Sequence, residues 1–401
     1  MISVEEASAR ILATFTPVGA ETVALAEAAG RISAAPVIAR TTQPPADVSA
    51  MDGFAVRAEE ARGGAALRLI GSAPAGHPFA GSVGAGETVR IFTGSFIPAG
   101  ADAVLLQEDA DAEEGGVRVR ETVRPGQHIR RMGQDFAHGD VVIAAGRRLS
   151  SRDIGLAAAA DHPWLLVHRR PRVAVLATGD EIALPGEPIP PGGIVSSNAH
   201  ALAAMVAALG GAPSVLPIAA DDTDAIGRAA DAARGFDLLL TTGGISVGAH
   251  DLVQEGLARR GLAVDFWKIA MRPGKPLMFG RLGEMPVLGL PGNPVAAFVC
   301  ALLFARPALL RLAGLAAAPL PTTTAETATA LGANDRRFDF LRARLEEDAA
   351  GRLVATAFAV QDSAMQAVLA RADALILRPP HAPAVAAGAA VEIVRFDRLG
   401  L

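Results

Sequence analysis

Short apolar runs alternate with helical patterns between residues 171 and 314. The runs have the length of strands, and the two helical patterns end at glycine. The predicted elements are strands at 172–177, 213–219 and 236–241 and helices at 198–209 and from a cap at Thr223 to near Gly235. This order predicts an α/β domain in which helices cover a parallel or mixed sheet. Ligands of such domains bind at the carboxyl ends of the strands.

Helical spacing also opens the chain, where Ser3 and Glu6 have the spacing of a capping box ahead of an apolar stripe. Residues 41–137 instead carry short β-like pieces between glycine and proline turns, which predicts an inserted β-rich domain. A second helix is predicted at 151–160, after a Ser cap. If it packs on the first helix, the two helices belong to one discontinuous helical domain.

Beyond Leu315, an Ala, Pro and Thr run to Thr324 has the composition of a linker. Four strand-like segments follow it and predict a C-terminal domain like a β-barrel. A chain of 401 residues exceeds a single typical core. The predicted domains are residues 1–40 with 138–170 (helical), 41–137 (β-rich), 171–314 (α/β) and 315–401 (β-barrel).

Composition limits the class of function. The net charge of -5 argues against general nucleic-acid binding, because no basic face dominates. We expect no membrane span and interpret the apolar stretch 294–305 as a buried helix. The N-terminus has no apolar signal core, so we expect a cytoplasmic protein. The single cysteine, Cys300, excludes an internal disulfide and a cysteine-built metal site.

A glycine-rich segment follows the predicted strand at 236–241. It begins with Gly243 and Gly244 and continues through Ser246, Gly248 and Asp251. Glycines let backbone N–H groups approach a phosphate or oxyanion, and a nearby Asp can hold the magnesium ion that balances the charge. Segments of the same character lie at 177–181, 272–276 and 290–294. Their order predicts one nucleotide-like site assembled from several strand ends.

Carboxylates accompany these turns. Asp180 and Glu181 follow the strand at 172–177 and are candidates for magnesium or water binding, although capping of the next loop is the alternative. Asp221, Asp222 and Asp251 come from neighbouring strand ends. Several carboxylates at one sheet edge repel each other unless a cation lies among them, which favours a functional cluster.

The segment 272–276 places Arg272 and Lys275 in a loop that prolines stiffen. Arg can make a forked contact to an oxyanion, and Lys supplies a point charge. Lys268 is a possible third cation, and an ordinary basic surface loop is the alternative. In the segment 290–294, Pro294 begins the next helix and offers its N-terminus to an anion. A tight structural turn is the competing interpretation there.

Two acidic residues lie in the predicted β-rich domain. Asp52 precedes Gly53, and composition alone favours an Asx-type turn for it. Asp135 follows the paired Arg130 and Arg131, and a solvated loop is the structural interpretation of that cluster. The eight histidines show no metal-ligand spacing.

Seven ordered motifs together resemble the MoeA family of molybdopterin molybdenumtransferases, which includes the gephyrin E domain. They lie at 49–56, 93–104, 126–135, 178–181, 243–251, 273–276 and 290–294. The resemblance runs from the first helix to the last strand. It implies four domains, among them a three-layer sheet domain like that of molybdopterin adenylyltransferases. It also implies a homodimer whose site combines the sheet domain of one subunit with the inserted domain of the other.

The activity implied by the resemblance is insertion of molybdate into adenylylated molybdopterin, with magnesium-dependent release of AMP. Catalytic roles fall to Asp52, Asp135, Glu181, Asp251 and Lys275, with Asp52, Glu181 and Asp251 as magnesium ligands. Substrate contacts fall to Thr178, Gly179, Asp180, Asp222, Gly243, Gly244, Ser246, Gly248, Arg272, Pro273, Gly274, Pro291, Gly292, Asn293 and Pro294. The resemblance also makes a molybdopterin adenylyltransferase and molybdoenzyme-maturation proteins candidate partners.

The chain departs from the family pattern in its C-terminal domain. Gln361, Asp362 and Ser363 stand where a Gly and Ser pair is usual, and Asn334, Asp335 and Arg336 replace a Gly-Arg pattern. These departures put a ligand role for that domain in doubt. The alternatives are the preceding adenylyltransferase, a tungstate-inserting paralogue, and a gephyrin-like scaffold, although the long low-complexity linker common in scaffolds is absent from this sequence.

Overall fold

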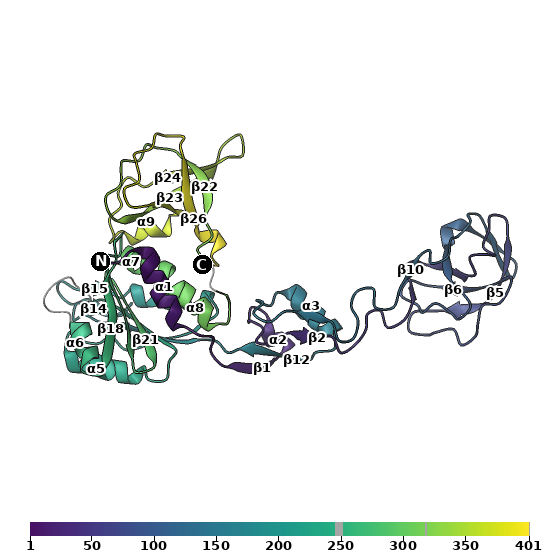
Figure 1. Ribbon diagram of the computed structural model, residues 1–401, viewed down its shortest axis with the longest axis horizontal. Coiled ribbons are helices and arrows are strands. Elements are labelled where there is room, and N and C mark those ends of the chain that lie inside the picture. The colour runs from purple at the N-terminus through teal and green to yellow at the C-terminus, as the bar shows by residue number, and fades with distance from the viewer. Residues whose placement is uncertain (245–251, 317–318, 401) are drawn as a thin grey trace.

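The computed structural model describes residues 1–244, 252–316 and 319–400. The molecule is elongated (Figure 1). The α/β domain and the C-terminal domain form one end, a small mixed unit lies in the middle, and a β-rich domain forms the other end. The multidomain α/β plus β architecture expected from the sequence is therefore confirmed.

A six-stranded mixed sheet forms the centre of the α/β domain. In spatial order its strands are β16 (Ala212–Val215), β13 (Arg172–Ala177), β17 (Leu238–Thr242), β21 (Met285–Leu290), β20 (Pro276–Leu282) and β18 (Leu262–Lys268). The first four are parallel, whereas β20 and β18 are antiparallel to their neighbours. The carboxyl ends of β13, β17 and β21 therefore meet at one edge.

Side chains of β13 alternate between two cores, as the twofold period of a strand requires. Val173 and Val175 pack with α4 (Asn198–Ala208) and α7 (Pro294–Cys300), whereas Ala174 and Leu176 pack with α5 (Thr223–Ala232) and α6 (Leu252–Ala258). The domain thus has three layers, and its strands are apolar on both faces.

Capping side chains set two helix starts, and the start of α5 lies one residue from the predicted position whereas that of α3 (Ser151–Ala159) lies where it was predicted. Asp222 is the N-cap of α5, and its carboxylate accepts a 2.8 Å hydrogen bond from the Ala225 N–H, so Thr223 is the first helical residue. Ser150 caps α3 in a capping box with Asp153. Both caps satisfy N–H groups that have no partner inside the helix.

The first helix, α1 (Val4–Thr14), does not pack on α3, as a single discontinuous helical domain would require. Its buried residues Ala7 and Ile11, and Phe15 after it, belong to the main core of the α/β domain beside α8 (Arg306–Leu312). The helix α3 packs instead in a separate core that contains Val23, Ile143 and Leu165. The apolar stripe of α1 is therefore part of the sheet domain.

The middle unit is mixed rather than purely helical. It contains α2 (Leu25–Ala28), α3 and two antiparallel strand pairs, β1 (Ala20–Ala24) with β12 (Trp164–His168) and β2 (Val37–Ile38) with β11 (Val141–Ile143). Segments from both sides of the inserted domain thus build one unit.

The β-rich domain contains a six-stranded sheet. Its order is β7 (Ala103–Leu106), β4 (Gly53–Val56), β6 (Glu87–Ile91), β5 (Ala66–Ala73), β9 (Gly116–Val119) and β8 (Ala110–Glu113). A short 3-10 turn (Gln107–Asp109) joins β7 to β8. Beside this sheet, β3 (Val48–Ser49) pairs with β10 (Ile129–Arg130) where the chain enters and leaves the domain.

The C-terminal domain is a closed barrel of five strands. They are β22 (Thr323–Thr327), β23 (Phe338–Glu347), β24 (Leu353–Ala357), β25 (Ala374–Arg378) and β26 (Ala390–Arg395). The pairing of β23 with β25 closes the ring, and β19 (Met271–Arg272) of the α/β domain adds to its edge at β23. A short helix α9 (Gln366–Ala370) and a terminal 3-10 turn (Phe396–Arg398) complete the domain.

One helical stretch, from Pro294 to Leu312, is long and apolar enough to cross a membrane by length and composition alone. It consists of α7, a π-helical turn (Ala301–Ala305) and α8. Of its most apolar window, 78% is buried inside the protein, which agrees with the expected buried core helix.

Candidate functional site

A cleft of about 630 Å³ lies at the carboxyl ends of β13, β17 and β21. It is lined by the strand ends Ala177 and Thr242, by Glu181 and Gly243, and by the loop from Pro291 to Pro294. Two small paired strands, β14 (Ile182–Ala183) and β15 (Ile194–Val195), border it. All four glycine-containing segments identified in the sequence therefore contribute to the cleft, and the segment 272–276 does so through Pro276.

Asn198, the first residue of α4, joins three parts of this cleft. Its amide nitrogen Nδ2 donates to Thr242 Oγ1 at 2.8 Å and to the Gly292 carbonyl at 2.7 Å. Thr242 Oγ1 in turn donates to the Pro291 carbonyl at 3.2 Å. Asn198 and Thr242 were not among the predicted site residues. Their hydrogen bonds join segments far apart in the chain, and the only local signals were an amide at a helix start and a hydroxyl at the end of a buried strand.

Glycines allow the loops of the cleft to approach closely. Gly243 has φ +94°, and a Cβ there would collide with the Thr178 carbonyl. The Cβ of any residue at Gly292 would lie 3.6 Å from the Gly243 Cα, so the two loops nearly touch. Thr178 Oγ1 is buried without a hydrogen-bond partner among the described residues. The glycines therefore allow close packing of these loops, and both Gly243 and Gly292 line the cleft.

Three carboxylates gather at the ends of β13 and β16. The Asp221 N–H donates to Asp180 Oδ1 at 3.0 Å. Burial raises the pKa of Asp221, and repulsion from the carboxylates of Glu181 and Asp180 raises it further. At Gly179, φ is +145°, a conformation that favours glycine, and an added Cβ would lie 2.6 Å from Glu181 Oε2, so this carboxylate would have to shift.

Not every predicted acid joins this group. Asp222 serves as the N-cap of α5, and Ser246, Gly248 and Asp251 lie outside the described residues. Within residues 1–244, 252–316 and 319–400, no three His, Cys, Asp or Glu side chains converge as a metal site. A magnesium site with Glu181 and Asp251 as ligands thus stays a prediction.

The loop with the two predicted cations is held by the core of the domain and by the barrel. The Arg272–Pro273 peptide bond is cis. Gly274 has φ +108°, and a Cβ there would collide with the sulfur of buried Cys300. The Lys275 side chain is exposed and makes no ion pair with any described residue. Lys275 is therefore the more available of the two predicted cations.

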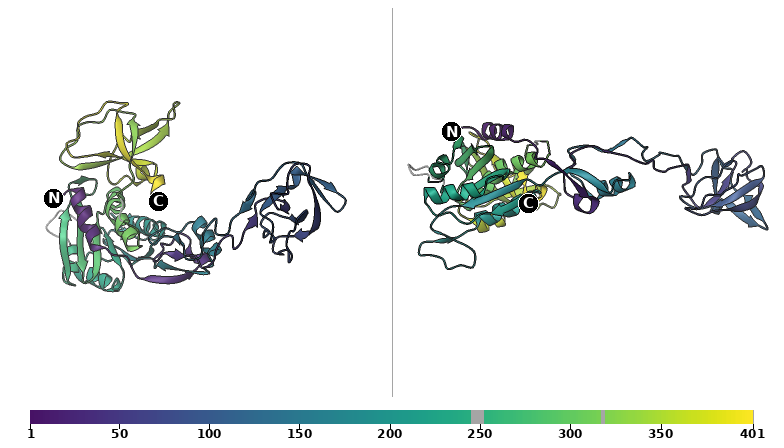
Figure 2. Two further views of the ribbon diagram at one scale, coloured as in Figure 1. Left: turned by 45° about the vertical axis from the view of Figure 1, so that its right-hand side comes forward. Right: turned by 90° about the horizontal axis from the view of Figure 1, so that it is seen from below.

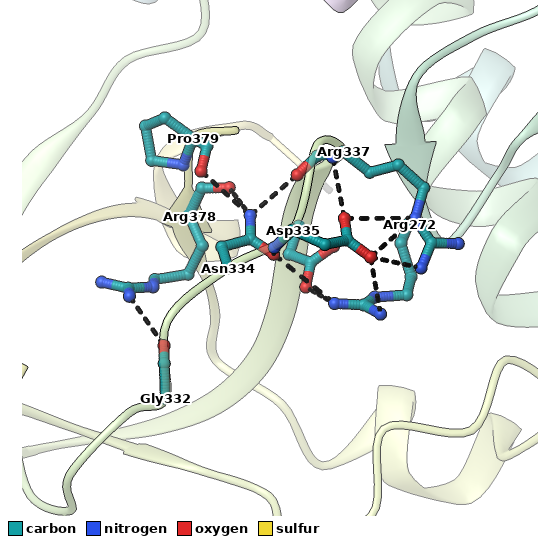
Figure 3. A network of polar contacts seen from close by, with 8 residues as sticks. Arg272, Gly332, Asn334, Asp335, Arg337, Arg378 and Pro379 are labelled. Atoms are coloured by element: carbon teal, nitrogen blue, oxygen red, sulfur yellow. Dashed lines mark hydrogen bonds and ion pairs between the residues drawn. The ribbon is translucent and has the colours of Figure 1, made fainter. Parts of the chain in front are cut away.

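Arg272 already pairs with polar residues of the barrel domain, as Figure 3 shows. Its guanidinium pairs with Asp339, which is buried, and lies 3.7 Å from Asp335 Oδ2 and 3.5 Å from Asn334 Oδ1. The Arg337 guanidinium and backbone N–H both bind Asp335, and these contacts lower the pKa of Asp335 to about 2. An anion at Arg272 would compete with these carboxylates.

The barrel also reaches the cleft through Ser363 and Ala364. Ser363 Oγ accepts a 2.8 Å hydrogen bond from Asn293 Nδ2, and its carbonyl accepts one of 3.0 Å from the Val295 N–H. Ala364 lines the cleft. The N-terminus of α7, predicted to face an anion, thus gives one of its free N–H groups to the C-terminal domain.

The departures from the family pattern have structural partners in this chain. Gln361 accepts hydrogen bonds from the backbone N–H and Nε of Arg342, whose side chain is almost fully buried in the barrel, and Asp362 contributes its carbonyl. Asn334 donates to the carbonyls of Arg337, Arg378 and Pro379. Asn334 thus belongs to the barrel side of the contact with Arg272, whereas Gln361 and Asp362 hold Arg342.

The remaining predicted carboxylates lie outside the α/β domain, with Asp52 directly before β4 of the β-rich domain and Asp135 in the connection that follows β10. Asp52 Oδ1 accepts hydrogen bonds from the N–H and Oγ1 of Thr93, at 2.7 and 2.8 Å, and these bonds lower the pKa of Asp52. Asp135 is exposed, and its N–H donates to the Gln43 carbonyl at 3.0 Å. Within one chain neither reaches the cleft.

Comparison with known families assigns each part of the chain. The MoeA N-terminal region (domain I and II) matches residues 2–160, a probable molybdopterin binding domain matches 174–311, and the MoeA C-terminal region (domain IV) matches 324–396. The cleft and its glycine turns lie mainly in the second of these.

Similar proteins match over nearly the whole length. A molybdopterin molybdenumtransferase of Haemophilus influenzae is 33% identical over 407 residues, covering 100% of both chains. Molybdopterin molybdenumtransferase 2 of Mycobacterium tuberculosis is 36% identical, covering 93% of this chain and 94% of its own. The crystal structure of a MoeA molybdopterin biosynthesis protein of Pyrococcus horikoshii superposes with a TM-score of 0.87, at 29% identity and 99% coverage of both chains. The chain belongs to the MoeA family.

Proposed function

We propose that the protein inserts molybdate into adenylylated molybdopterin and releases AMP, completing molybdenum cofactor biosynthesis. The observation that carries the proposal is the glycine-lined cleft at the strand ends, located mainly in the segment that matches a probable molybdopterin binding domain. Curated relatives that span the chain carry the name molybdopterin molybdenumtransferase. The protein is accordingly a transferase.

The chain's own groups suit a substrate with a phosphate chain and an oxyanion. Gly243 and Gly292 line the cleft, where the backbone of glycine turns can bind phosphate oxygens, and Asn198 fixes the loop that carries Gly292. Lys275 supplies an unpaired cation for molybdate. The dithiolene sulfurs belong to the substrate, which agrees with a cysteine that is buried and whose pKa burial raises.

Magnesium fits the acidic end of the cleft. Asp180, Glu181 and Asp221 repel one another at this end of the sheet, and a cation would relieve that repulsion, although among the described residues these three do not by themselves form a metal site. Glu181 would hold the ion, with Asp251 from the neighbouring loop and Asp52 from a second subunit. When bound, the ion would neutralise the charge that develops as the phosphoanhydride is cut.

A second copy of the chain would complete the site. Asp52 and Asp135 belong to the family-like motifs yet lie in the β-rich domain and its connection, which Figure 2 shows apart from the α/β domain that carries Glu181. An antiparallel homodimer of two elongated chains would bring the β-rich domain of one copy to the cleft of the other. This arrangement accounts for two carboxylates that a single chain leaves without a partner site.

The activity is tested by anaerobic incubation with adenylylated molybdopterin, magnesium and either molybdate or tungstate. AMP and loaded cofactor are both measured. We expect release of AMP coupled to metal insertion, and the two oxyanions separate the molybdate enzyme from a tungstate-inserting paralogue. In a parallel incubation with molybdopterin, ATP and magnesium, formation of adenylylated molybdopterin and pyrophosphate without metal insertion in the first assay would instead identify an adenylyltransferase, and the absence of both reactions would refute the proposal.

The shared site is tested by mixing two inactive variants. Glu181→Gln and Asp52→Asn each keep the side-chain shape but remove the charge that holds a hard cation, so each should fold and lose AMP release. In heterodimers one of the two sites then carries both intact residues, and activity should return in part. Differently tagged subunits verify exchange. Verified heterodimers as inactive as their parents would show that the carboxylates act within one subunit.

A further inference from the structure

A second large cleft lies at the opposite edge of the central sheet from the candidate site. Its volume is about 650 Å³, and it is bordered by the residues just before β13 and β17, by the β20–β21 turn and by the end of α1. The chain passes this edge on its way to the middle unit (Figure 1). Nothing in the proposed reaction uses it.

Four arginines line this cleft, from four different segments: Arg169, Arg234, Arg260 and Arg281. Arg169 is the most firmly held of the four. Its guanidinium makes a forked pair with Asp237, at 2.7 and 2.6 Å, and Asp237 also accepts the Arg172 N–H at 2.7 Å. The Asp237 carboxylate therefore already accepts three hydrogen bonds, and it holds Arg169 in place.

The other three guanidinium groups are less well compensated. Arg234 and Arg260 share one carboxylate, that of Asp231, at 3.0 and 3.4 Å. Arg281 pairs at 3.1 Å with Glu284, whose side chain is fully exposed, and such exposed pairs contribute little. The side chains of Arg234, Arg260 and Arg281 remain 72%, 37% and 44% exposed. All three are thus accessible to a ligand.

Arg260 is held in position by the fold. It follows α6 and lies across α5, where a Cβ at Gly227 would come within 2.7 Å of its Nε. Glycine at this helical position costs stability relative to alanine, and here it makes room for the arginine. The Arg260 head is thereby directed to the same cleft as Arg281 from the hairpin opposite.

The charge of the cleft is opposite to that of the chain. Four arginines and two carboxylates, Asp237 and Glu284, line the cleft, so its lining residues carry an excess of positive charge in a protein of net charge -5. Beside the cleft, Asp231 pairs with Arg234 and Arg260, and Glu21 interacts electrostatically with Arg169. Guanidinium groups bind phosphate in forked geometry. Phe236, Leu282 and Pro286 supply an apolar wall beside them.

We propose that this cleft binds a small organic phosphate of about nucleotide size, at a site separate from the catalytic cleft. The arginines Arg234, Arg260 and Arg281 take the phosphate groups, and the apolar wall takes the organic part. Arg169, which pairs with Asp237, acts as a positioning residue on its side of the cleft. The proposal does not depend on the proposed function, because it concerns binding at a different edge of the sheet.

Calorimetric titration of the full chain with ADP, and separately with inorganic pyrophosphate, tests the site at low salt. We expect saturable binding of ADP that weakens as salt rises. Arg260→Ala and Arg281→Ala should each weaken it about 10-fold or more, because each removes a charge-assisted contact. Pyrophosphate should bind more weakly than ADP, and equal affinity would contradict the role of the apolar wall.

Arg259→Ala is the matched control. Arg259 is adjacent in sequence, but it pairs with Glu255 and Asp224 outside the cleft. Its removal deletes the same charge and should leave ADP binding unchanged. Thermal unfolding of each variant verifies folding, and Arg281 provides a second test because it has no contact with Gly227. The proposal is overturned if wild type binds no ADP at millimolar concentration, if the cleft variants bind like wild type, or if only Lys275→Ala abolishes binding.

Discussion

Two neighbouring cations illustrate how single residues differ in this site. Arg272 is paired with Asp339 and faces Asp335, whereas Lys275 is exposed without an ion pair among the described residues. Lys275→Ala should therefore raise the molybdate concentration needed for half-maximal AMP release about 10- to 100-fold, since one charge-assisted contact is lost. Binding of the adenylylated pterin should change little.

Arg228→Ala is a suitable control for that experiment. Arg228 is an exposed cation of α5 that does not line the cleft, so its removal changes the net charge equally. An unchanged molybdate requirement in Lys275→Ala would remove Lys275 from the site.

Asp221 should make stability depend on pH. Its pKa is raised by burial and by repulsion from Glu181 and Asp180, so the folded state disfavours the ionised form. The associated stability is present below the ordinary pKa of 3.8 and is lost as pH rises through the raised value. Asp221→Asn should accordingly melt at a higher temperature than wild type at about pH 7, and the difference should shrink as pH falls toward 3.8.

Magnesium and a neighbouring acid provide the controls. Added magnesium should stabilise wild type more than Asp221→Asn, because the cation relieves the same repulsion. Asp224→Asn removes an acid from the first turn of α5 and should lower the melting temperature instead. A pH-independent gain in Asp221→Asn would contradict the electrostatic explanation.

At the scale of elements, the loop from Arg272 to Pro276 depends on a glycine packed against α7. Gly274→Ala adds a Cβ that collides with Cys300 at a positive φ, whereas Gly283→Ala meets a positive φ with nothing within 4 Å. Both should be destabilising, and Gly274→Ala by roughly 1 to 3 kcal/mol more, the usual cost of overpacking a core. Chemical denaturation of the two variants measures the difference, and equal losses would show that the loop yields without strain.

Element positions were largely predictable from the sequence because local signals determine them. The strand at 172–177 was expected with the observed bounds, since an apolar run bounded by polar turns has one interpretation. The start of α5 was displaced by one residue, because two adjacent side chains, Asp222 and Thr223, could cap it. The packing partner of α1 was not predictable, because its apolar stripe fits either core.

The site was predictable only in part for a similar reason. Glycine turns after strands are local signals, and they do meet at one cleft. The hydrogen bonds of Asn198 and the contact of Asn293 with Ser363 join segments far apart in the chain, so no local pattern announces them. The pairing of Arg272 with Asp339 likewise depends on how the barrel docks.

At the scale of the whole molecule, the separation of Asp52 from Glu181 predicts self-association. Light scattering of the purified protein should give about twice the chain mass of 41.0 kDa. The dimer should persist at micromolar concentration, because each site needs both subunits. A monomer that still produces loaded cofactor would contradict the shared site.

The two connections that carry the β-rich domain run side by side. Gln43 pairs with Phe136, Asp47 binds Arg131 at 2.6 Å and the Met132 N–H at 2.9 Å, and β3 then pairs with β10. Entry and exit therefore form one double-stranded stem. The β-rich domain is therefore a module whose two ends are adjacent. A short loop between the two connections would join the remaining chain without this domain. The same position would accept another domain whose termini lie equally near each other.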